Sequence, residues 1–332
     1  MTRILNQIPD GNIRDDKVQS VQTVMRPLII IIFTSILLLC DCAFLCLAAH
    51  AAALPLGSSP ESNQDKDGES KKEGKNIFLP RGNLFQPLLA DPKELRFYLG
   101  YRPYQKANHY LSRQTEMFTG GLGDMFGLFR HTDNGRGYAL QANISGGIYA
   151  EFDLKTSSYF LVDNDYYFGL PFTLRSGPYS YRLNLYHQSS HVGDEYLQHS
   201  TIQRVEFSYE ALNIIASYDI KKWRVYYGGE VIVHKSPSTY KPVTVQGGIE
   251  YYDTQQTLLG GRIVGGVDLK CTEENNWPLN LSAKAGLQFD EEIMRGRAIR
   301  FLLEGYEGYS PQGQFFNNRM TYIGLGITFE FQ

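Results

Sequence analysis

The segment that most constrains the fold is the last one of the chain, residues 322–332, because its side chains alternate in polarity. The odd-numbered positions 323 to 331 are all apolar, and the even-numbered positions 322 to 330 are tyrosine, glycine, threonine or glutamate. Successive side chains of a β-strand point to opposite faces of a sheet. The alternation therefore predicts a strand with one wholly apolar face and one small or polar face.

Similar period-two segments recur from Asn76 onward, separated by Gly, Pro, Asp and Asn, and no helical apolar stripe of useful length appears among them. We predict strands over 95–104, 114–130, 137–153, 159–175, 179–190, 201–219, 222–235, 240–253, 258–270, 278–289, 297–309 and 319–331. The count is even, as bacterial outer-membrane barrels require, when 201–219 is taken as one bent strand with a bulge.

The predicted fold is therefore all-β: a transmembrane antiparallel β-barrel of about 12 strands in a bacterial cell outer membrane. The 32 Gly, 23 Tyr and 13% aromatic residues suit a sheet with aromatic belts. The last segment resembles the C-terminal signal of outer-membrane barrels, with Gln332 added after the usual terminal aromatic. That resemblance implies the barrel-assembly machinery as a partner. The rival fold is a soluble β-sandwich, which explains the alternation alone.

The first part of the chain is predicted to be a targeting region. Residues 28–53 form an apolar run with an alanine-rich end, which favours a signal peptide over a retained membrane anchor. We assign 1–53 to an N-terminal extension and signal peptide, with Met25 as the expected start. Residues 54–76 are expected to form a disordered periplasmic linker, and 77–332 the barrel. Beyond residue 53, Cys271 is the only cysteine, which excludes a disulfide framework.

A candidate catalytic pair lies on the predicted strand 179–190. His187 and Ser189 share the face expected to meet lipid, near the outer end, where polar groups are costly unless they serve a purpose. The imidazole of a histidine two residues away can act as general base for a serine nucleophile. The pair resembles the His-x-Ser motif of outer-membrane phospholipase A and the lipid A deacylases, which implies an ester hydrolase acting on outer-membrane lipid. The alternative is a pair of interfacial polar residues.

Four further residues are candidates for assisting this pair. Asn164 on the preceding strand is expected near Ser189, where it would orient or polarise the pair. His191, Asp194 and Glu195 are loop candidates, as the orienting group or as calcium ligands. Calcium is the one cofactor kept as a candidate.

The opposite strand face predicts a charged lumen. Its members are Arg96, Arg102, Glu151, Asp163, Asp165, Arg175, Arg182 and Glu230. Such charges either pair inside a filled or narrow barrel, which we favour, or line a selective channel. A third hypothesis is an adhesive or structural envelope protein that presents loops 236–240 and 309–313. A net charge of −3 gives no basic surface for nucleic acid.

Three stretches together resemble a family of predicted outer-membrane proteins, domain-of-unknown-function family 1207. They are Leu84–Glu94 (LFQPLLADPKE), Asp165–Pro171 (DYYFGLP) and His187–Tyr196 (HQSSHVGDEY). The resemblance runs from about Leu84 to Gln332. It implies an envelope location and a barrel, and it implies no substrate and no catalytic residues.

Overall fold

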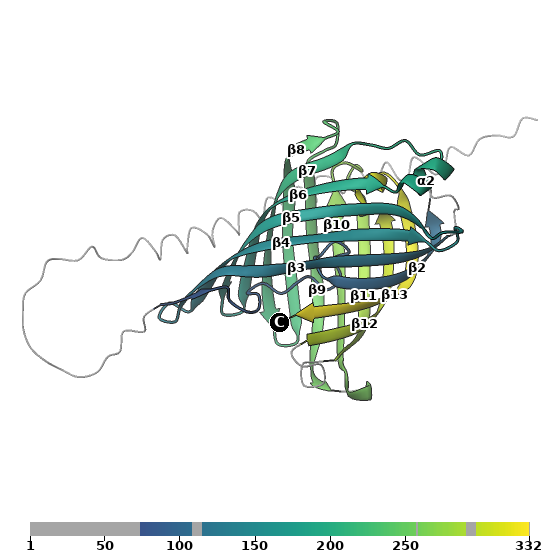
Figure 1. Ribbon diagram of the computed structural model, residues 1–332. Coiled ribbons are helices and arrows are strands. Elements are labelled where there is room, and N and C mark those ends of the chain that lie inside the picture. The colour runs from purple at the N-terminus through teal and green to yellow at the C-terminus, as the bar shows by residue number, and fades with distance from the viewer. Residues whose placement is uncertain (1–73, 108–114, 257, 290–296, 332) are drawn as a thin grey trace, which may run out of the picture. The chain divides into compact units, whose positions relative to one another are not determined.

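The structure is a computed structural model that describes residues 74–107, 115–256, 258–289 and 297–331. One antiparallel sheet contains every strand of this part of the chain (Figure 1). The strands are β1 (Lys75–Phe78), β2 (Phe97–Ala107), β3 (Thr115–Asp133), β4 (Tyr138–Asp153), β5 (Phe160–Ser176), β6 (Tyr179–Val192), β7 (Phe207–Ile220), β8 (Trp223–Ser236), β9 (Val243–Gln256), β10 (Arg262–Thr272), β11 (Leu279–Phe289), β12 (Arg297–Tyr309) and β13 (Arg319–Phe331).

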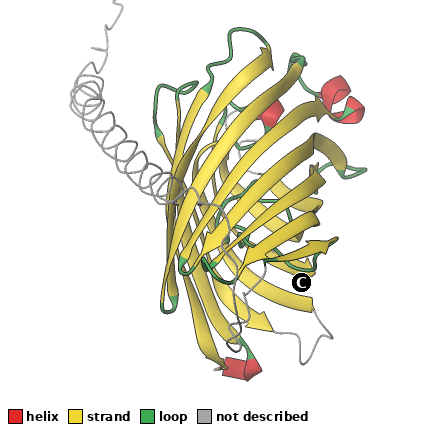
Figure 2. Ribbon diagram, turned by 90° about the vertical axis from the view of Figure 1, so that its left-hand side faces the viewer, coloured by secondary structure: helices red, strands yellow, loops and turns green. Residues whose placement is uncertain are grey.

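Strands β2 to β13 form a closed barrel (Figure 2). Each pairs with its neighbours in sequence, and β13 pairs with β2 through partners such as Gly326 and Gly100. Closure satisfies the backbone hydrogen bonds of both edge strands, which a sheet in lipid requires. The predicted antiparallel barrel of about 12 strands is therefore confirmed.

The strand boundaries differ from the predicted ones in two informative places. Strand β7 begins at Phe207, whereas the predicted strand began at residue 201. A register shift occurs between Glu210 and Ala211 against β8, but its extra residue is Val233 of β8, so the bulge predicted within 201–219 is not on β7. Strand β1 begins at Lys75, so Lys75 and Asn76 belong to the sheet and not to the linker predicted over 54–76. The rest of that linker and the predicted signal peptide lie outside the described residues.

Connections of different length gather at the two ends of the barrel. The turns 134–137, 177–178 and 221–222 lie at one end, here called the turn end. The longer connections 154–159, 193–206, 237–242, 273–278 and 310–318 lie at the other, here called the loop end. The shortest turns therefore lie at one end and the longest connections at the other, and in outer-membrane barrels the long loops face the cell exterior.

The outer face of the barrel is apolar. Large side chains more than half exposed include Leu122, Phe126, Phe168, Phe172, Ile214, Val233, Leu303, Ile323 and Leu325. Near the turn end, Tyr179 packs on Tyr218 at 4.7 Å and Trp223 on Tyr251 at 4.8 Å between ring centroids. Apolar bands edged by aromatic rings are the membrane-facing surfaces of outer-membrane barrels. The chain is thus a transmembrane barrel of the bacterial outer-membrane type.

Within the described ranges, no helix has the length and apolar character needed to cross a membrane. The two short helical elements at the loop end are α2 (Asp194–His199), which follows β6, and the 3-10 turn η2 (Gly313–Phe315), which precedes β13. Tyr196 of α2 is fully buried and meets Phe315 edge-to-face at 6.3 Å. These two connections therefore pack against each other at the end of the barrel.

Residues 84–96, between β1 and β2, fill part of the lumen and are here called the plug. Phe85, Leu88 and Leu89 are fully buried although they belong to no strand or helix. The guanidinium groups of Arg182 and Arg224 lie over the Phe85 ring, 4.8 and 4.5 Å from its centroid. Cations placed over an aromatic ring stabilise its position. The lumen is therefore occupied by the chain itself, as the favoured filled-barrel prediction requires.

Candidate functional site

The predicted pair His187 and Ser189 lies on the outer face of β6. Their neighbours Tyr186, Gln188 and Ser190 are buried in the lumen, as strand alternation demands. Both members of the pair are partly exposed on the membrane-facing side. The orientation predicted from sequence parity is therefore found in the structure.

His187 is held by Glu210, which the sequence analysis did not select. The two residues are direct partners across β6 and β7, and the His187 Nδ1 lies 2.8 Å from the Glu210 Oε1. A carboxylate at Nδ1 keeps the proton on that nitrogen and leaves Nε2 free to accept another. Glu210 also contacts His234 of β8, whose Nδ1 lies 2.7 Å from the Oε2. Glu210 lies on the same face of β7 as the exposed Leu212 and Ile214. A charged residue in a row of lipid-facing apolar residues is the sequence feature that could have identified it.

Ser189 lies between Tyr166 of β5 and Ser208 of β7 in the sheet register. Ser189 and His187 share one strand face two positions apart, which separates their Cα atoms by about 6.5–7 Å. Among the contacts of the described residues, none joins the two side chains directly. Proton transfer between them would require the Ser189 hydroxyl and the His187 imidazole to rotate toward each other.

Asn164 lies on β5 two positions from Tyr166, the register partner of Ser189. The register places it directly opposite His191. Its amide donates a hydrogen bond of 2.9 Å to the hydroxyl of Tyr166. The group that contacts the candidate base is Glu210 on the following strand.

The loop candidates stand apart from the pair. His191 meets the Tyr166 ring at 5.8 Å, and Arg204 lies 3.2 Å from its Nδ1. Asp194 and Glu195 form the exposed first turn of α2. In the part of the chain that the structure describes, no group of three or more His, Cys, Asp or Glu residues is arranged to hold a metal ion. The residues present thus do not support the calcium site proposed for Asp194 and Glu195.

The depth of Ser189 can be estimated from the aromatic belt at the turn end. Ser189 follows Tyr179 by ten residues on the same strand. At roughly 3.3 Å per residue and a strand tilt of about 40°, it lies ~25 Å above that belt. The apolar band of an outer-membrane barrel is also ~25 Å tall. At this height above the belt, the pair lies at the membrane–water interface on the loop-end side of the apolar band. The ester groups of lipids lie at that depth.

The lumen contains a second polar site, where the plug is bound to the wall. Arg182 of β6 binds Glu94 with its Nη1 2.5 Å from a carboxylate oxygen, and Lys270 of β10 binds Asp91 at 2.8 Å. Lys93 forms an ion pair with Asp165 of β5. Each of these links joins the plug to a different strand, so residues 91–94 of the plug are fixed to β5, β6 and β10.

The three sequence stretches that carry the family resemblance meet at this place. Lys93 belongs to the first and Asp165 to the second. Ser190, from the third, donates a 3.1 Å hydrogen bond to Asp163 and accepts one of 3.0 Å from the backbone N–H of Gln314. The Gly313 N–H lies 3.3 Å from both Asp165 carboxylate oxygens. Connection 310–318 therefore folds inward, and its 309–313 part is not the displayed loop that the adhesive hypothesis assumed.

The predicted inward charges are mostly paired. Arg102 lies between Glu151 at 3.6 Å and Glu304 at 3.4 Å, and all three are buried. Arg175 differs, because it lies near the turn end and pairs with the partly exposed Asp219. Most of these charges therefore cross-link the wall or hold the plug, which explains them without a conducting pore.

Comparison with known proteins gives a family and a set of similar folds. The model of a family described as protein of unknown function (DUF1207) matches residues 49–331. No curated protein matches the sequence. Among solved structures, outer membrane phospholipase A from Escherichia coli is 17% identical, with 74% of this chain and 93% of that chain covered and a TM-score of 0.47.

Two further solved structures have a TM-score equal to or lower than this one. The outer membrane phospholipase dimer of Salmonella typhi with bound calcium is 15% identical over 73% of this chain and 94% of that chain, with a TM-score of 0.47. The translocator domain of the autotransporter NalP from Neisseria meningitidis is 10% identical over 73% and 91%, with a TM-score of 0.34. These likenesses assign no activity and no residue.

Proposed function

From the premise that this chain belongs to the DUF1207 family, we propose that it is an outer-membrane hydrolase of lipid acyl esters, with Ser189 as nucleophile and His187 as base. The observation that carries the proposal is the contact between His187 Nδ1 and Glu210 at 2.8 Å on the membrane-facing side. Acid, base and hydroxyl are the three parts of a serine hydrolase. Here they lie on two adjacent strands of one outer face.

The exposure of the site suits a substrate that arrives from the membrane. The side chains of His187 and Glu210 keep 44% and 40% of their surface accessible. A charged carboxylate is costly on a lipid-facing row unless it is near the interface or has a task. A lipid in the outer leaflet would bring its ester carbonyl beside Ser189 without entering the lumen.

The chemistry follows from the positions of these groups. The Ser189 Oγ attacks the ester carbonyl carbon while its proton passes to His187 Nε2, and Glu210 stabilises the imidazolium through Nδ1–H. The alcohol part of the lipid leaves with the proton from His187, and an acyl-serine remains. Water then gives a proton to His187 and attacks the acyl group, which releases the fatty acid and restores Ser189.

The test is fatty-acid release by the full-length protein folded in detergent micelles that contain phospholipid or lipopolysaccharide, with and without calcium. We expect the wild type to release fatty acid, and Ser189→Ala and His187→Ala to lose essentially all of the release. Ser208→Ala is the matched serine control, because Ser208 lies opposite Ser189 on the same face. His131→Ala is the histidine control, since His131 contacts Asn76 and lies on β3 near the turn end.

Folding is checked for each variant by circular dichroism and by the heat-dependent mobility shift of folded barrels on gels. Both controls are expected to retain the wild-type rate. Absence of release from a folded wild-type protein on every lipid would overturn the proposal. Equal loss in Ser208→Ala would contradict Ser189 as the nucleophile.

A further inference from the structure

We infer that the lumen holds a binding site for a small organic cation, a protonated amine, in the cavity between the plug and the loop end. This site lies on the opposite face of the wall from Ser189 and does not depend on the proposed hydrolase. The cavity has a volume of about 200 Å³. This volume has room for roughly six waters at ~30 Å³ each. It is smaller than the ~300–1,000 Å³ of sites for drug-sized ligands, so it suits one small molecule.

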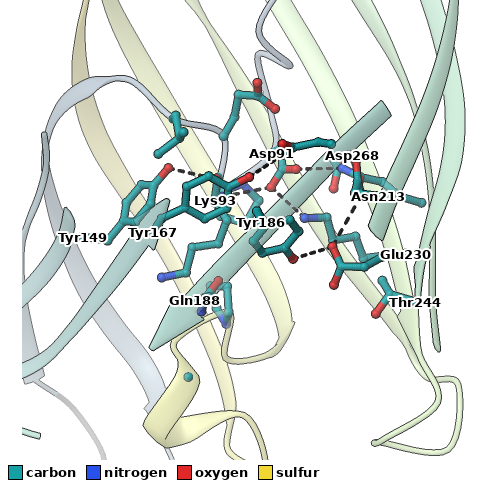
Figure 3. Close-up of a pocket in the computed structure, with 18 of the residues that line it drawn as sticks. Asp91, Lys93, Tyr149, Tyr167, Tyr186, Gln188, Asn213, Glu230, Thr244 and Asp268 are labelled. Atoms are coloured by element: carbon teal, nitrogen blue, oxygen red, sulfur yellow. Dashed lines mark hydrogen bonds and ion pairs between the residues drawn. The ribbon is translucent and has the colours of Figure 1, made fainter. Parts of the chain in front are cut away.

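Carboxylates outnumber cations where the plug meets β8 and β10 (Figure 3). Asp91, Glu230 and Asp268 all line the cavity and all act electrostatically on the single ammonium of Lys270. Lys270 is bound by Asp91 at 2.8 Å, and Gln246 joins Asp91 to Asp268 at 2.8 and 2.7 Å. With the three acids ionised, two negative charges in this group have no cation of their own.

Glu230 is the carboxylate best placed for a ligand. In the described part of the chain it forms no ion pair, and its hydrogen bonds come from two neutral donors, the Tyr186 hydroxyl at 2.5 Å and the Asn213 amide at 3.5 Å. Glu230 is partly buried, and a carboxylate that is partly withdrawn from water is stabilised by an opposite charge. An ammonium group supplied by a ligand would provide that charge.

A second, independent feature of the same cavity is a pair of buried oxygens without partners. The Oδ1 of Asn184 and the Oγ of Ser145 line the cavity, are buried, and form no hydrogen bond. Asn184 is 6% exposed and Ser145 3% exposed. Buried polar atoms without partners are rare in folded proteins.

Gly169 keeps the space between these oxygens open. A Cβ atom at Gly169 would lie 2.9 Å from both the Asn184 Oδ1 and the Ser145 Oγ. Gly169 is therefore a position at which a single methyl group would crowd both oxygens and displace them.

The two features lie within reach of one small ligand. Asn184, Asn213 and Glu230 are successive partners on β6, β7 and β8, so Asn184 and Glu230 are two strands apart, or about 10 Å. Both ends present acceptors, which match the three donors of an ammonium group. One ammonium is already held by acceptors in this cavity, because the Lys93 ammonium of the plug donates hydrogen bonds to Asp165 and Gln312.

An organic cation fits these groups better than a metal ion. Across the described residues no set of three His, Cys, Asp or Glu residues is arranged for a metal. Access is from the loop end, since Tyr240, Asn275 and Ser310, from three different loop-end connections, line the same cavity. A short diamine that places one ammonium at Glu230 and the other between Asn184 and Ser145 has the required reach.

The experiment is titration calorimetry of the full-length protein folded in detergent with 1,4-diaminobutane. We expect one site per chain, and at least a tenfold loss of affinity in Glu230→Gln, which keeps the hydrogen bonds but removes the charge. Gly169→Ala is expected to weaken binding by a similar factor without changing the charge. Glu116→Gln, at a partly exposed position on β3, is the matched control and should bind as the wild type does.

Glucose and acetate are titrated in parallel as a neutral hydroxyl-rich ligand and an anion. Binding of glucose in preference to the diamine would overturn the inference, as would absence of diamine binding to the folded wild type. Unchanged affinity in Glu230→Gln would also contradict it. Fatty-acid release is measured on the same samples. Glu230→Gln leaves the outer face intact, so it should change diamine binding without changing the rate of fatty-acid release.

Discussion

At the scale of single residues, the outer face of β6 and β7 concentrates the polar chemistry. The Glu210 carboxylate contacts two imidazoles. Its oxygens lie 2.8 Å from the Nδ1 of His187 and 2.7 Å from the Nδ1 of His234. Its carboxylate therefore has a defined orientation although it is partly exposed. Simple surface ion pairs contribute little to stability. A role in holding His187 for catalysis accounts better for a carboxylate on a lipid-facing row.

Replacing Glu210 by glutamine tests this role. We expect Glu210→Gln to lower the rate of fatty-acid release by roughly 10²–10⁴-fold, because a neutral amide cannot stabilise the imidazolium. Glu210→Asp should retain more of the rate, since it keeps the charge. The measurement is the initial rate in the lipid assay described above, on variants whose barrel is folded.

Asn164→Ala is the comparison for that variant. Asn164 contacts the Tyr166 hydroxyl and not His187, so the rate should stay near that of the wild type. A loss in Asn164→Ala as large as in Glu210→Gln would support the role that the sequence predicted for Asn164.

At the scale of elements, the sequence predicted the wall but not what fills it. Strand alternation is a local property, so most of the twelve wall strands could be predicted within a few residues, as β13 and β6 show, whereas β7 begins six residues later than predicted. The plug has no periodicity, because its order comes from contacts to wall residues far away in sequence, such as Leu89 N–H to Glu250 at 2.5 Å. Glu210 was missed for the same reason, since it is recognisable only once the register with β6 is known. The pair His187 and Ser189 was predictable because both residues lie on one strand.

The plug prediction concerns Phe85. Phe85→Ala should lower the free energy of unfolding by about 3–5 kcal/mol, because a fully buried ring in contact with two guanidinium groups is lost. Denaturant unfolding of the protein in lipid vesicles measures this change. Phe172→Ala, on the outer face, is the matched control with a smaller expected loss.

The same variant also tests whether the plug occludes the lumen. Recordings in planar lipid bilayers should show more frequent openings for Phe85→Ala than for the wild type. Large steady conductance in the wild type would mean that the plug does not block ion flow, and the channel hypothesis would regain support.

At the scale of the whole molecule, the two ends of the barrel are chemically different. The turn end has short connections and an aromatic belt, and the loop end has long connections that pack inward. The proposed hydrolase pair lies near the loop end on the outer side of the wall, and the proposed cation site lies near the middle of β6 and β8 on the inner side. The orientation of the barrel in the membrane therefore decides which compartment each site serves.

Cysteine labelling in intact cells checks that orientation. With the native cysteines replaced, Ser238→Cys in connection 237–242 should react with a membrane-impermeant maleimide. Arg136→Cys in turn 134–137 should react only after the outer membrane is opened. The reverse pattern would show that the loop end faces the periplasm and would remove the outer-leaflet substrate from the proposal.

The position of the plug in the chain has a consequence for the order of assembly. The plug precedes β2, so it leaves the ribosome before any of the twelve wall strands, and β1 on β3 and β2 itself fix its two ends to the wall. The seam that closes the barrel joins the first wall strand to the last, β2 to β13. Because the plug is synthesised before both strands of that seam, it is available to the wall strands throughout their assembly. Its ion pairs with β5, β6 and β10 thus give the chain an internal template on which the wall can close.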